Sequence, residues 1–463
     1  MTNSLDTICA VSTAPGVGGI AVVRVSGSQA LPICESLLSL KRQPLSQVGS
    51  HTAHCCQVRD GERVVDEAVC TVFRAPRSFT GEDTVEIACH GSRYIQQEVL
   101  RLLLQNGCRM ATGGEFTKRA FLNGKMDLAE AEAVADLIAS ESAAAHRLAL
   151  NQMRGGFSEE LRQLRGRLLE LTSLLELELD FSEEDVEFAD RSQLHALCEQ
   201  IAAKIQTLSC SFKLGNALKN GIPVAIVGET NAGKSTLLNR LLGEDKAIVS
   251  DIHGTTRDTI EDQVVIGGVN FRFIDTAGIR ETDDQIENIG IKRSYGAMEK
   301  ASIVVWMIDA LQVSEHIDWM ADRIVPRCEG KNLLIVFNKA ESLSADDRAV
   351  LDKLYADIPA TRLFLSAKFD ADLASLEEEL LRLSGVAELE QHELLVTNMR
   401  HYEALVQAGA AIERVQQGLQ QGLSGELVSM DLHDCLDALG SIVGEVSSDE
   451  VLANIFSKFC IGT

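Results

Sequence analysis

A single eight-residue segment constrains the fold of this chain more than any other. Residues 228–235 read Gly-Glu-Thr-Asn-Ala-Gly-Lys-Ser, which is the G-x-x-x-x-G-K-[ST] spacing of a phosphate-binding loop. The apolar run 223–227 before it predicts a buried strand, and the residues from Thr236 onward predict a helix. Loop N–H groups and the helix N-terminus can then face a phosphate, with Lys234 near the β- and γ-oxygens and Ser235 near Mg²⁺. The segment therefore predicts a nucleotide-binding α/β domain.

Three further segments follow in the order expected of a guanine-nucleotide switch domain. They are Asp275 to Gly278 after a predicted strand at 271–274, Asn338 to Glu341 after one at 333–337, and Ser366 to Lys368 after one at 363–365. An aspartate at the first of these can reach Mg²⁺ through water, and the glycine N–H can contact the γ-phosphate. Ligands of open α/β sheets bind beyond the carboxyl ends of the strands, so we expect all four segments to converge on one crevice.

The segment at 338–341 predicts which base is bound. Asn338 and Lys339 followed two residues later by a carboxylate select guanine, because the carboxylate accepts from the ring N–H and the exocyclic amino group. Here the carboxylate is Glu341, whose extra methylene moves it outward by about 1.5 Å relative to the usual aspartate. We still predict guanine over adenine.

The stretch 247–258 lies where a first switch loop belongs, and Thr255 or Thr256 should complete the Mg²⁺ shell. Loop chemistry alone cannot choose between the two. Many GTPases orient the attacking water with a glutamine directly after D-x-x-G, whereas this chain has Ile279, which cannot hold water. The alternatives left open are Glu281, Asp283, Asp284 and Glu287 of the second switch, Arg257, Arg280, an arginine from a partner, and a bound monovalent cation.

Composition limits the partners and the compartment. The net charge of −25 repels phosphate backbones, so a nucleic-acid partner needs a second protein or a local basic patch, for which Lys118, Arg119 and Lys125 are the clearest candidates. No apolar run approaches the roughly 20 residues that span a bilayer, and the N-terminus does not resemble a signal peptide. We therefore expect a cytoplasmic protein without a membrane span.

The twelve cysteines include no C-x-x-C pair, so we expect most of them to be small buried hydrophobic side chains. Residues 51–56 hold two histidines and two cysteines but alternate like a strand, which favours a strand over a metal site. The tail 459–463 superficially fits a prenylation box, but Gly462 replaces an aliphatic residue and no polybasic stretch precedes it. We expect no lipid there.

Periodicity predicts a multidomain chain. The stretches 20–25 and 84–88 alternate like strands, whereas 128–150, 157–179, 193–218 and the region after 398 have helical spacing. The predicted domains are an N-terminal α+β domain at 1–120, an all-α helical domain in two halves at 121–219 and 386–463, and an inserted α/β P-loop (Ras-like) GTPase domain at 220–385.

Taken together, these segments resemble the MnmE (TrmE) family of bacterial tRNA-modification GTPases, nearly end to end. Beyond the nucleotide motifs, the stretches that carry the resemblance are Asp6 to Ile8, Pro15 to Gly19, Arg24 to Gly27, Thr80 to Asp83, Gly114 to Lys125 and Phe459 to Gly462.

The resemblance implies that the N-terminal domain dimerises and binds 5-formyl-tetrahydrofolate or another one-carbon folate. Arg24, Glu82 and Lys125 would contact it, since cations suit the ligand's carboxylates or ring carbonyl and a carboxylate suits the pterin N–H donors. Thr463 stands where the family normally has a lysine, which removes a cation from the fourth expected contact. Cys460 keeps its place in the tail, as a nucleophile or as a buried inert thiol.

The resemblance also implies roles at the nucleotide site. K⁺ would be coordinated by Asn231, Ser250, Ile252 and Thr255 and would replace an arginine finger when two nucleotide domains meet, while Ser235 and Thr256 would serve Mg²⁺. Glu287 would position the attacking water, and Lys234 would act in catalysis. The full set of expected GTP-binding residues is Asn231, Ala232, Gly233, Lys234, Ser235, Thr236, Ser250, Asp251, Ile252, His253, Gly254, Thr255, Thr256, Asp275, Thr276, Ala277, Gly278, Asn338, Lys339, Ala340, Glu341, Ser366, Ala367 and Lys368.

The reaction implied by the resemblance is installation of an aminomethyl or carboxymethylaminomethyl group on C5 of wobble uridine in tRNA. The homodimer would act with the FAD-containing partner MnmG in a heterotetramer or larger assembly, and tRNA would bind mostly through that partner. GTP hydrolysis would drive opening and closing of the domains. Two other readings remain: a regulatory or ribosome-assembly GTPase switch without modification chemistry, and a scaffold that hydrolyses little GTP.

Overall fold

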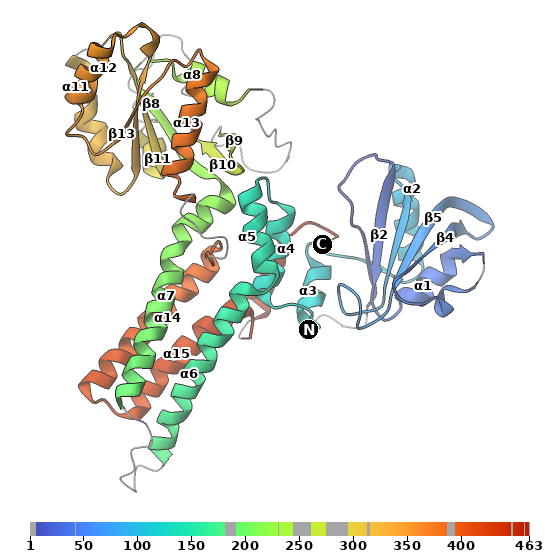
Figure 1. Cartoon of the computed structure of the whole chain (residues 1–463). Helices are drawn as coiled ribbons and strands as arrows, with labels where there is room; N and C mark the ends of the chain where they lie inside the picture. The colour runs from blue at the N-terminus through green and yellow to red at the C-terminus, as the bar shows by residue number, and fades with distance from the viewer. Residues whose placement is uncertain are drawn as a thin grey trace. The chain divides into compact units, whose positions relative to one another are not determined.

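The computed structural model describes residues 6–41, 43–180, 191–229, 231–243, 261–274, 295–312, 315–386, 394–445, 448–457 and 459–462. The chain forms two compact units (Figure 1). One comprises Met1–Ile138, Leu150–Ile201 and Gln407–Thr463, and the other comprises Ala139–Ala149 and Ala202–Val406. Each unit therefore contains segments that are far apart in the sequence.

A seven-stranded sheet in the order β3-β4-β5-β6-β2-β1-β7 organises the N-terminal part of the first unit. Its strands are β1 (Ile8–Val11), β2 (Ile20–Ser26), β3 (Leu38–Leu40), β4 (Thr52–Asp60), β5 (Arg63–Phe73), β6 (Thr84–His90) and β7 (Arg109–Met110). Only β1 and β7 pair in parallel. Val23, Val25 and Ile87 share a buried cluster with side chains of α1 (Ala30–Leu37) and α2 (Arg93–Gln105). The predicted strands at 20–25 and 84–88 and the α+β class of this part are confirmed.

The helical part of the first unit is held by leucines on facing helices. Buried Leu161, Leu164, Leu168 and Leu171 recur at helical spacing along α6 (Gly156–Asp180), which packs against α15 (Gly425–Val443). Each fully buried leucine contributes about 1.5–3 kcal/mol. This unit also holds α3 (Glu115–Leu122), α4 (Leu128–Ile138) and α16 (Asp449–Ser457). Two longer helices, α7 (Arg191–Asn220) and α14 (Met399–Gln421), each have residues in both units.

The helical spacing predicted for 128–150 is confirmed, but the stretch is divided between two helices. The chain forms α4 and then a separate helix α5 (Ala143–Met153). Ser142 lies directly before α5, and its Oγ accepts a hydrogen bond from the N–H of Ala145 at 3.1 Å. A serine at this position satisfies one of the unpaired N–H groups of a helix start, so it favours a new helix over continuation of the previous one.

The second unit contains a six-stranded sheet in the order β13-β12-β11-β8-β10-β9. Its strands are β8 (Ile222–Gly228), β9 (Asp262–Ile266), β10 (Val269–Phe273), β11 (Ile303–Asp309), β12 (Asn332–Asn338) and β13 (Thr361–Phe364). All neighbours are parallel except the β9–β10 hairpin. The four strands predicted beside the nucleotide motifs coincide with β8, β10, β12 and β13 to within two residues at each end.

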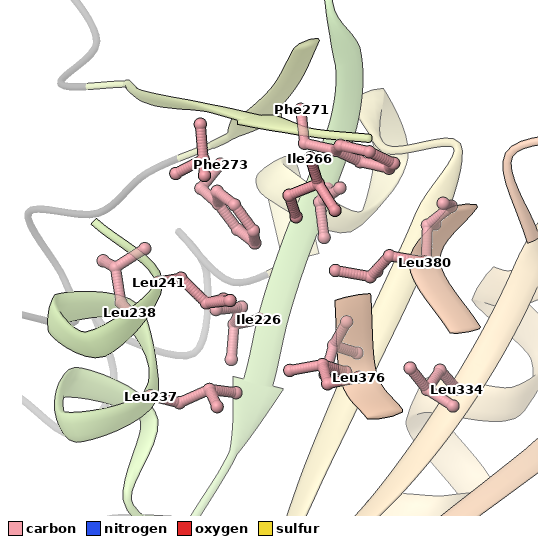
Figure 2. Packing of buried hydrophobic residues seen from close by; sticks show 14 of the residues in the cluster. Ile226, Leu237, Leu238, Leu241, Ile266, Phe271, Phe273, Leu334, Leu376 and Leu380 are labelled. Atoms are coloured by element: carbon pink, nitrogen blue, oxygen red, sulfur yellow. The ribbon is translucent and has the colours of Figure 1, made fainter. Parts of the chain in front are cut away.

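Helices cover both faces of this sheet, so successive side chains of β8 enter different cores. Val224 and Ile226 join one cluster, and Ala225 and Val227 join the other. In the first cluster, leucines of α8 (Lys234–Leu241) and α13 (Asp370–Leu383) gather over β8 (Figure 2). The second is covered by α11 (Glu315–Ile324), α12 (Ala345–Leu354) and the 3₁₀ turn Val325–Cys328, and η4 (Ala340–Ser342) follows β12. The α/β P-loop class predicted for this region is confirmed.

The helix α5 also packs onto this sheet. The N–H of Ala144 donates to the carbonyl oxygen of Gly268 at 3.0 Å, and Ala144 is buried in the same cluster as Phe271. Gly267 and Gly268 form the tight β9–β10 turn with φ of 55° and 80°, the left-handed backbone that a two-residue hairpin turn requires. A segment from before the nucleotide motifs thus completes the core around the hairpin.

Candidate functional site

The loop between β8 and α8 has a backbone that glycine adopts most readily. Gly228 and Gly233 have φ of 147° and 98°. A Cβ at Gly228 would lie 2.2 Å from the carbonyl oxygen of Met307, and a Cβ at Gly233 would lie 2.2 Å from Nδ2 of Asn338. Gly228 is therefore needed for the close approach of β11, and Gly233 leaves room for the side chain of Asn338. The exposed Asn231 between them also has a positive φ of 67°.

The ammonium group of Lys234 folds back over this loop. Its Nζ donates to the carbonyl oxygens of Gly228 at 2.8 Å and Glu229 at 2.6 Å. Burial lowers the pKa of Lys234 to about 8, and the nearby Glu229 opposes this only in part. A bound phosphate would supply the opposite charge that a buried ammonium lacks, so the loop is electrostatically suited to an anion.

Asn338 at the end of β12 connects three of the predicted motif segments. Its side chain is buried, its Nδ2 donates to the carbonyl oxygen of Ala232 at 2.7 Å, and its Oδ1 accepts from the N–H of Ala367 at 2.9 Å. The phosphate loop, the 338–341 segment and the 366–368 segment therefore meet at one edge of the sheet, as the strand topology requires.

The neighbours of Asn338 shape the rest of this edge. Lys339 has a positive φ of 63°, and its Nζ pairs with Oδ2 of Asp309 at 2.5 Å. Ala340 donates its N–H to the carbonyl oxygen of Leu365 at 3.1 Å. Glu341 is exposed, as a carboxylate that meets a base must be.

Several expected site residues lie outside the described residues, and their roles stay predictions. These are Ser250, Asp251, Ile252, His253, Gly254, Thr255, Thr256, Asp275, Thr276, Ala277, Gly278, Glu287 and Thr463.

The structure brings the three expected folate residues of the described chain into one region. Ser26 lies two residues after Arg24 on the same face of β2, and its Oγ donates to Oε2 of Glu82 at 2.8 Å. A Cβ at Gly81, where φ is 79°, would lie 3.3 Å from Cγ of Lys125. The loop that carries Glu82 therefore lies between β2 and the segment after α3.

Arg24 is supported by rings on one side and a carboxylate on the other. Its guanidinium carbon lies 5.4 Å from the centre of the Phe79 ring and 5.5 Å from that of Phe116, and its Nε pairs with Glu86 at 3.0 Å. Lys125 is exposed, with Nζ 3.1 Å from the carbonyl oxygen of Pro76. Two cations and one carboxylate thus lie on neighbouring segments, and such groups suit a ligand with acidic groups and N–H donors.

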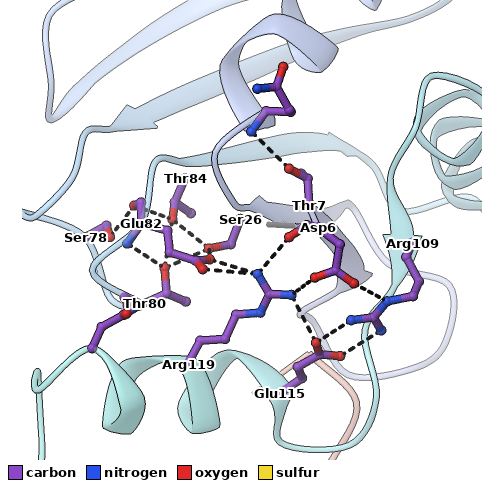
Figure 3. A network of polar contacts seen from close by, with 12 residues as sticks. Asp6, Thr7, Ser26, Ser78, Thr80, Glu82, Thr84, Arg109, Glu115 and Arg119 are labelled. Carbon is purple, nitrogen blue, oxygen red and sulfur yellow. Dashed lines mark hydrogen bonds and ion pairs between the residues drawn. The ribbon is translucent and has the colours of Figure 1, made fainter. Parts of the chain in front are cut away.

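A polar network lies directly behind Glu82 (Figure 3). Arg119 pairs with Glu82 at 3.1 Å, with Asp6 at 2.6 Å and with Glu115 at 3.1 Å. Arg109 pairs with Asp6 at 2.7 Å and with Glu115 at 2.6 Å. Burial raises the pKa of Glu115, but the hydrogen bonds from Arg109, the N–H of Thr112 and Arg119 outweigh it and lower that pKa to about 2.

The prediction that Arg119 belongs to an exposed basic patch is wrong. Its side chain is only 10% exposed and faces three carboxylates. The guanidinium of Arg119 on α3 therefore faces the interior, and the adjacent basic residues Lys118 and Arg119 do not indicate this in the sequence.

Comparison with known proteins decides the family. Residues 7–125 match the model described as "GTP-binding protein TrmE N-terminus", and residues 128–460 match that of the "MnmE helical domain". The tRNA modification GTPase MnmE of Bacteroides thetaiotaomicron is 54% identical over 462 residues, with 99% of each chain covered. This chain belongs to the MnmE family. The MnmE of Flavobacterium johnsoniae is 50% identical over the same length, again with 99% of each chain covered.

The MnmE helical match spans the nucleotide domain as well as the helices, and the full-length identity confirms the resemblance inferred from the motifs. Among solved structures, Era of Aquifex aeolicus aligns with 41% of this chain and 65% of its own, at 25% identity and a TM-score of 0.29. No described helix is both long and apolar enough to cross a membrane.

The C-terminal tail of this MnmE-family chain lies on the N-terminal domain. Ile461 forms a β-bridge with Gly113, and the N–H of Gly114 donates to the carbonyl oxygen of Cys460 at 3.2 Å. A Cβ at Gly462, where φ is 99°, would lie 2.4 Å from the carbonyl oxygen of Val11, so the family glycine is required by close packing. Cys460 itself is exposed, so the expectation of a buried thiol is wrong, and its role as a nucleophile stays a prediction.

Nine of the twelve cysteines are buried, which confirms the expectation for most of them. Cys55 and Cys56 are consecutive residues of β4; the first is exposed and the second buried. Consecutive side chains of a strand point to opposite faces, so these two thiols do not converge on one site.

Proposed function

We propose that this chain hydrolyses GTP to GDP and phosphate within a tRNA-modifying assembly. The observation that carries the proposal is its 54% identity, over 99% of both chains, to a protein named tRNA modification GTPase MnmE. In this proposal the cytoplasmic homodimer works with the FAD-containing MnmG in a heterotetramer or larger, and installs an aminomethyl or carboxymethylaminomethyl group on C5 of wobble uridine. An acidic chain of net charge −25 fits a role in which tRNA is held mainly by the partner.

Lys234 would bind the β- and γ-phosphates by exchanging its two carbonyl acceptors for phosphate oxygens. The α8 N-terminus and the N–H groups of the loop would face the same anion. Asn338 would keep the loop in register with the base-binding segment through its bond to Ala232. These residues would orient the γ-phosphate and offset its charge, which is most of what catalysis of phosphoryl transfer requires.

The residues present also fit the two proposed metals. Ser235 offers a hydroxyl oxygen in the first turn of α8, a donor that Mg²⁺ accepts, and Thr256 would be the second protein ligand. Asn231 is exposed on the loop, where its amide oxygen is available to K⁺ together with Ser250, Ile252 and Thr255. K⁺ would supply positive charge near the transferred phosphoryl group, in place of an arginine.

Glu287 would position the attacking water, and its replacement tests the hydrolysis mechanism. We expect Glu287→Ala to keep nucleotide binding and to lose most single-turnover GTP hydrolysis. Glu281→Ala is the matched control, since it removes a carboxylate of the same second-switch stretch and should leave the rate near wild type. An unchanged rate in Glu287→Ala would refute the assignment.

Salt and nucleotide dependence test the remaining parts of the nucleotide proposal. Hydrolysis should be faster in KCl than in NaCl at equal ionic strength. Equal rates in the two salts would refute the proposed K⁺ site. Unlabelled GTP should displace a bound fluorescent guanine nucleotide far better than ATP does. Equal competition by ATP would show that Glu341 does not select guanine.

Arg24, Glu82 and Lys125 would hold a one-carbon folate, such as 5-formyl-tetrahydrofolate, in the N-terminal domain. The two cations would meet acidic or carbonyl groups of the ligand, and Glu82 would accept from pterin N–H groups. Calorimetric titration of the homodimer tests this, because Glu82→Gln should weaken binding while the exposed Glu62→Gln should not. Equal affinities for both variants would exclude Glu82.

The modification chemistry is tested in cells. Mass spectrometry of tRNA from cells that lack this protein should show unmodified C5 at wobble uridine, and the wild-type chain should restore the modification. Cys460→Ser tests the exposed thiol, since a nucleophile at that position predicts failure to restore. Normal wobble uridine in the deletion strain would favour a switch without modification chemistry.

A further inference from the structure

Glu82 is held from two sides by groups that do not belong to the expected folate contacts. Nη1 of Arg119 donates to Oε1 and Oε2 of Glu82 at 3.1 and 3.3 Å. Oγ of Ser26 donates to Oε2 at 2.8 Å and lies 2.7 Å from Oγ1 of Thr80. Both carboxylate oxygens are therefore fixed in direction while 18% of the side chain stays exposed.

Arg119 is itself fixed by the N-terminal segment and by α3. Its Nη1 also donates to the carbonyl oxygen of Asp6 at 2.9 Å, and its Nη2 donates to Oδ1 of Asp6 at 2.6 Å and to Oε1 of Glu115 at 3.1 Å. A guanidinium is planar and presents its donors in a fixed fork. The orientation of Glu82 is therefore set relative to the start of β1 and to α3, rather than by its own loop alone.

The charges of the network leave one carboxylate in excess, and the contacts identify it. Asp6, Glu82 and Glu115 face Arg109 and Arg119, so three anions meet two cations. Asp6 and Glu115 each pair with both arginines, whereas the ion pairs of Glu82 within the described residues involve Arg119 only. Negative charge that the network does not balance therefore lies at Glu82, the carboxylate nearest the proposed ligand.

We propose that Arg119 is a positioning residue of the folate site. It holds the carboxylate of Glu82 turned so that its remaining lone pairs accept from N–H donors of a pterin-like ring. The inference rests on the proposed folate role of Glu82 and adds a residue that makes no contact with the ligand itself. Arg109 lies in the same network without touching Glu82, which provides a matched control.

A double-mutant cycle on the full-length homodimer tests the inference, with calorimetric titration of 5-formyl-tetrahydrofolate as the readout. Glu82→Gln and Arg119→Met should each weaken binding about 10-fold or more, as expected for loss of a charged hydrogen bond. The double variant should bind within about 2-fold of Glu82→Gln, because Arg119 acts through Glu82. Arg109→Met, which removes an equal charge from the network, should weaken binding less than about 3-fold.

A purely structural role for Arg119 predicts different results. In that case Arg109→Met would weaken binding as much as Arg119→Met, or the two losses in the double variant would add, and either outcome overturns the inference. Wild-type affinity in Arg119→Met overturns it as well. If the wild-type chain binds no folate, or if Glu82→Gln binds normally, the folate role of Glu82 fails first, so the two failures are distinguishable.

Two milder variants keep the test decisive if Arg119→Met does not fold. Ser26→Ala removes only the second donor to Glu82 and should weaken binding measurably without loss of the dimer. Arg119→Lys keeps the charge but loses the planar fork, so it should rescue folding and only part of the affinity. Full affinity in both variants would overturn the inference.

Discussion

Glu115 offers a quantitative test of the network behind the candidate folate site. Its side chain is 12% exposed and accepts from Arg109, Arg119 and the N–H of Thr112. Burial opposes ionisation, but these donors lower the pKa of Glu115 from 4.5 to about 2. At about 1.4 kcal/mol for each pKa unit, the difference is worth at most roughly 3 kcal/mol, and partial solvent screening reduces our expectation to about 2 kcal/mol.

The sign of the pH dependence follows from the lowered pKa. The ionised carboxylate stabilises the folded state fully above the unfolded pKa of 4.5, and this contribution is lost as the pH falls toward the folded pKa of about 2. Glu115→Gln should therefore cost about 2 kcal/mol at pH 7, and this penalty should shrink by roughly 40% at pH 3.5.

Hydrogen exchange of peptides that cover β1 and α3 measures this penalty locally in the full-length protein. A local readout is needed because a chain with two compact units does not unfold in one step. Glu62→Gln in the exposed β4–β5 turn is the control and should change nothing. The reasoning is refuted if wild type and Glu115→Gln show the same opening free energy at pH 7, or a difference that does not depend on pH.

Other predictions concern the nucleotide domain. Asn338→Ala should weaken GTP binding about 10-fold or more in a fluorescence titration. The change removes the hydrogen bond to the carbonyl oxygen of Ala232 and leaves the N–H of Ala367 without its acceptor, so unchanged affinity would contradict the bridging role. Gly228→Ala should lower the thermal midpoint of the domain by several degrees, because its Cβ would meet a backbone oxygen at 2.2 Å. Phe271→Ala should cost about 3–5 kcal/mol in urea unfolding followed by tryptophan fluorescence (Trp306 and Trp319), since Phe271 is buried; a loss under 1 kcal/mol would show that the core collapses around the gap.

The sequence predicts the parts of this molecule that depend on local pattern. β8 and β12 are continuous apolar runs that end in polar motif residues. Their positions, and the end of the sheet at which both motifs lie, could therefore be predicted from the sequence. Helical spacing over 128–150 predicts helix but does not locate the boundary between α4 and α5. Ser142, a typical helix-start residue, is the local signal that marks this boundary.

The contacts of Arg119 could not be read from the sequence. Its partners Asp6 and Glu82 lie 113 and 37 residues away, so only the folded sheet brings them together. Two adjacent basic residues within a helix are equally compatible with an exposed patch and with a buried ion-pair network, and the burial of Arg119 decides for the network. The packing of Ala144 against the β9–β10 turn could not be predicted for the same reason, because a small apolar residue does not indicate which segment it will contact.

The packing of α5 on the β9–β10 hairpin determines which fragment of the nucleotide domain can be produced on its own. A fragment cut at residues 220 and 385 would lack Ala144 and Leu218, which are buried in the core of its sheet. Such a fragment would expose an apolar surface and would be prone to aggregate, unless residues 139–149 are supplied in trans or fused by a linker.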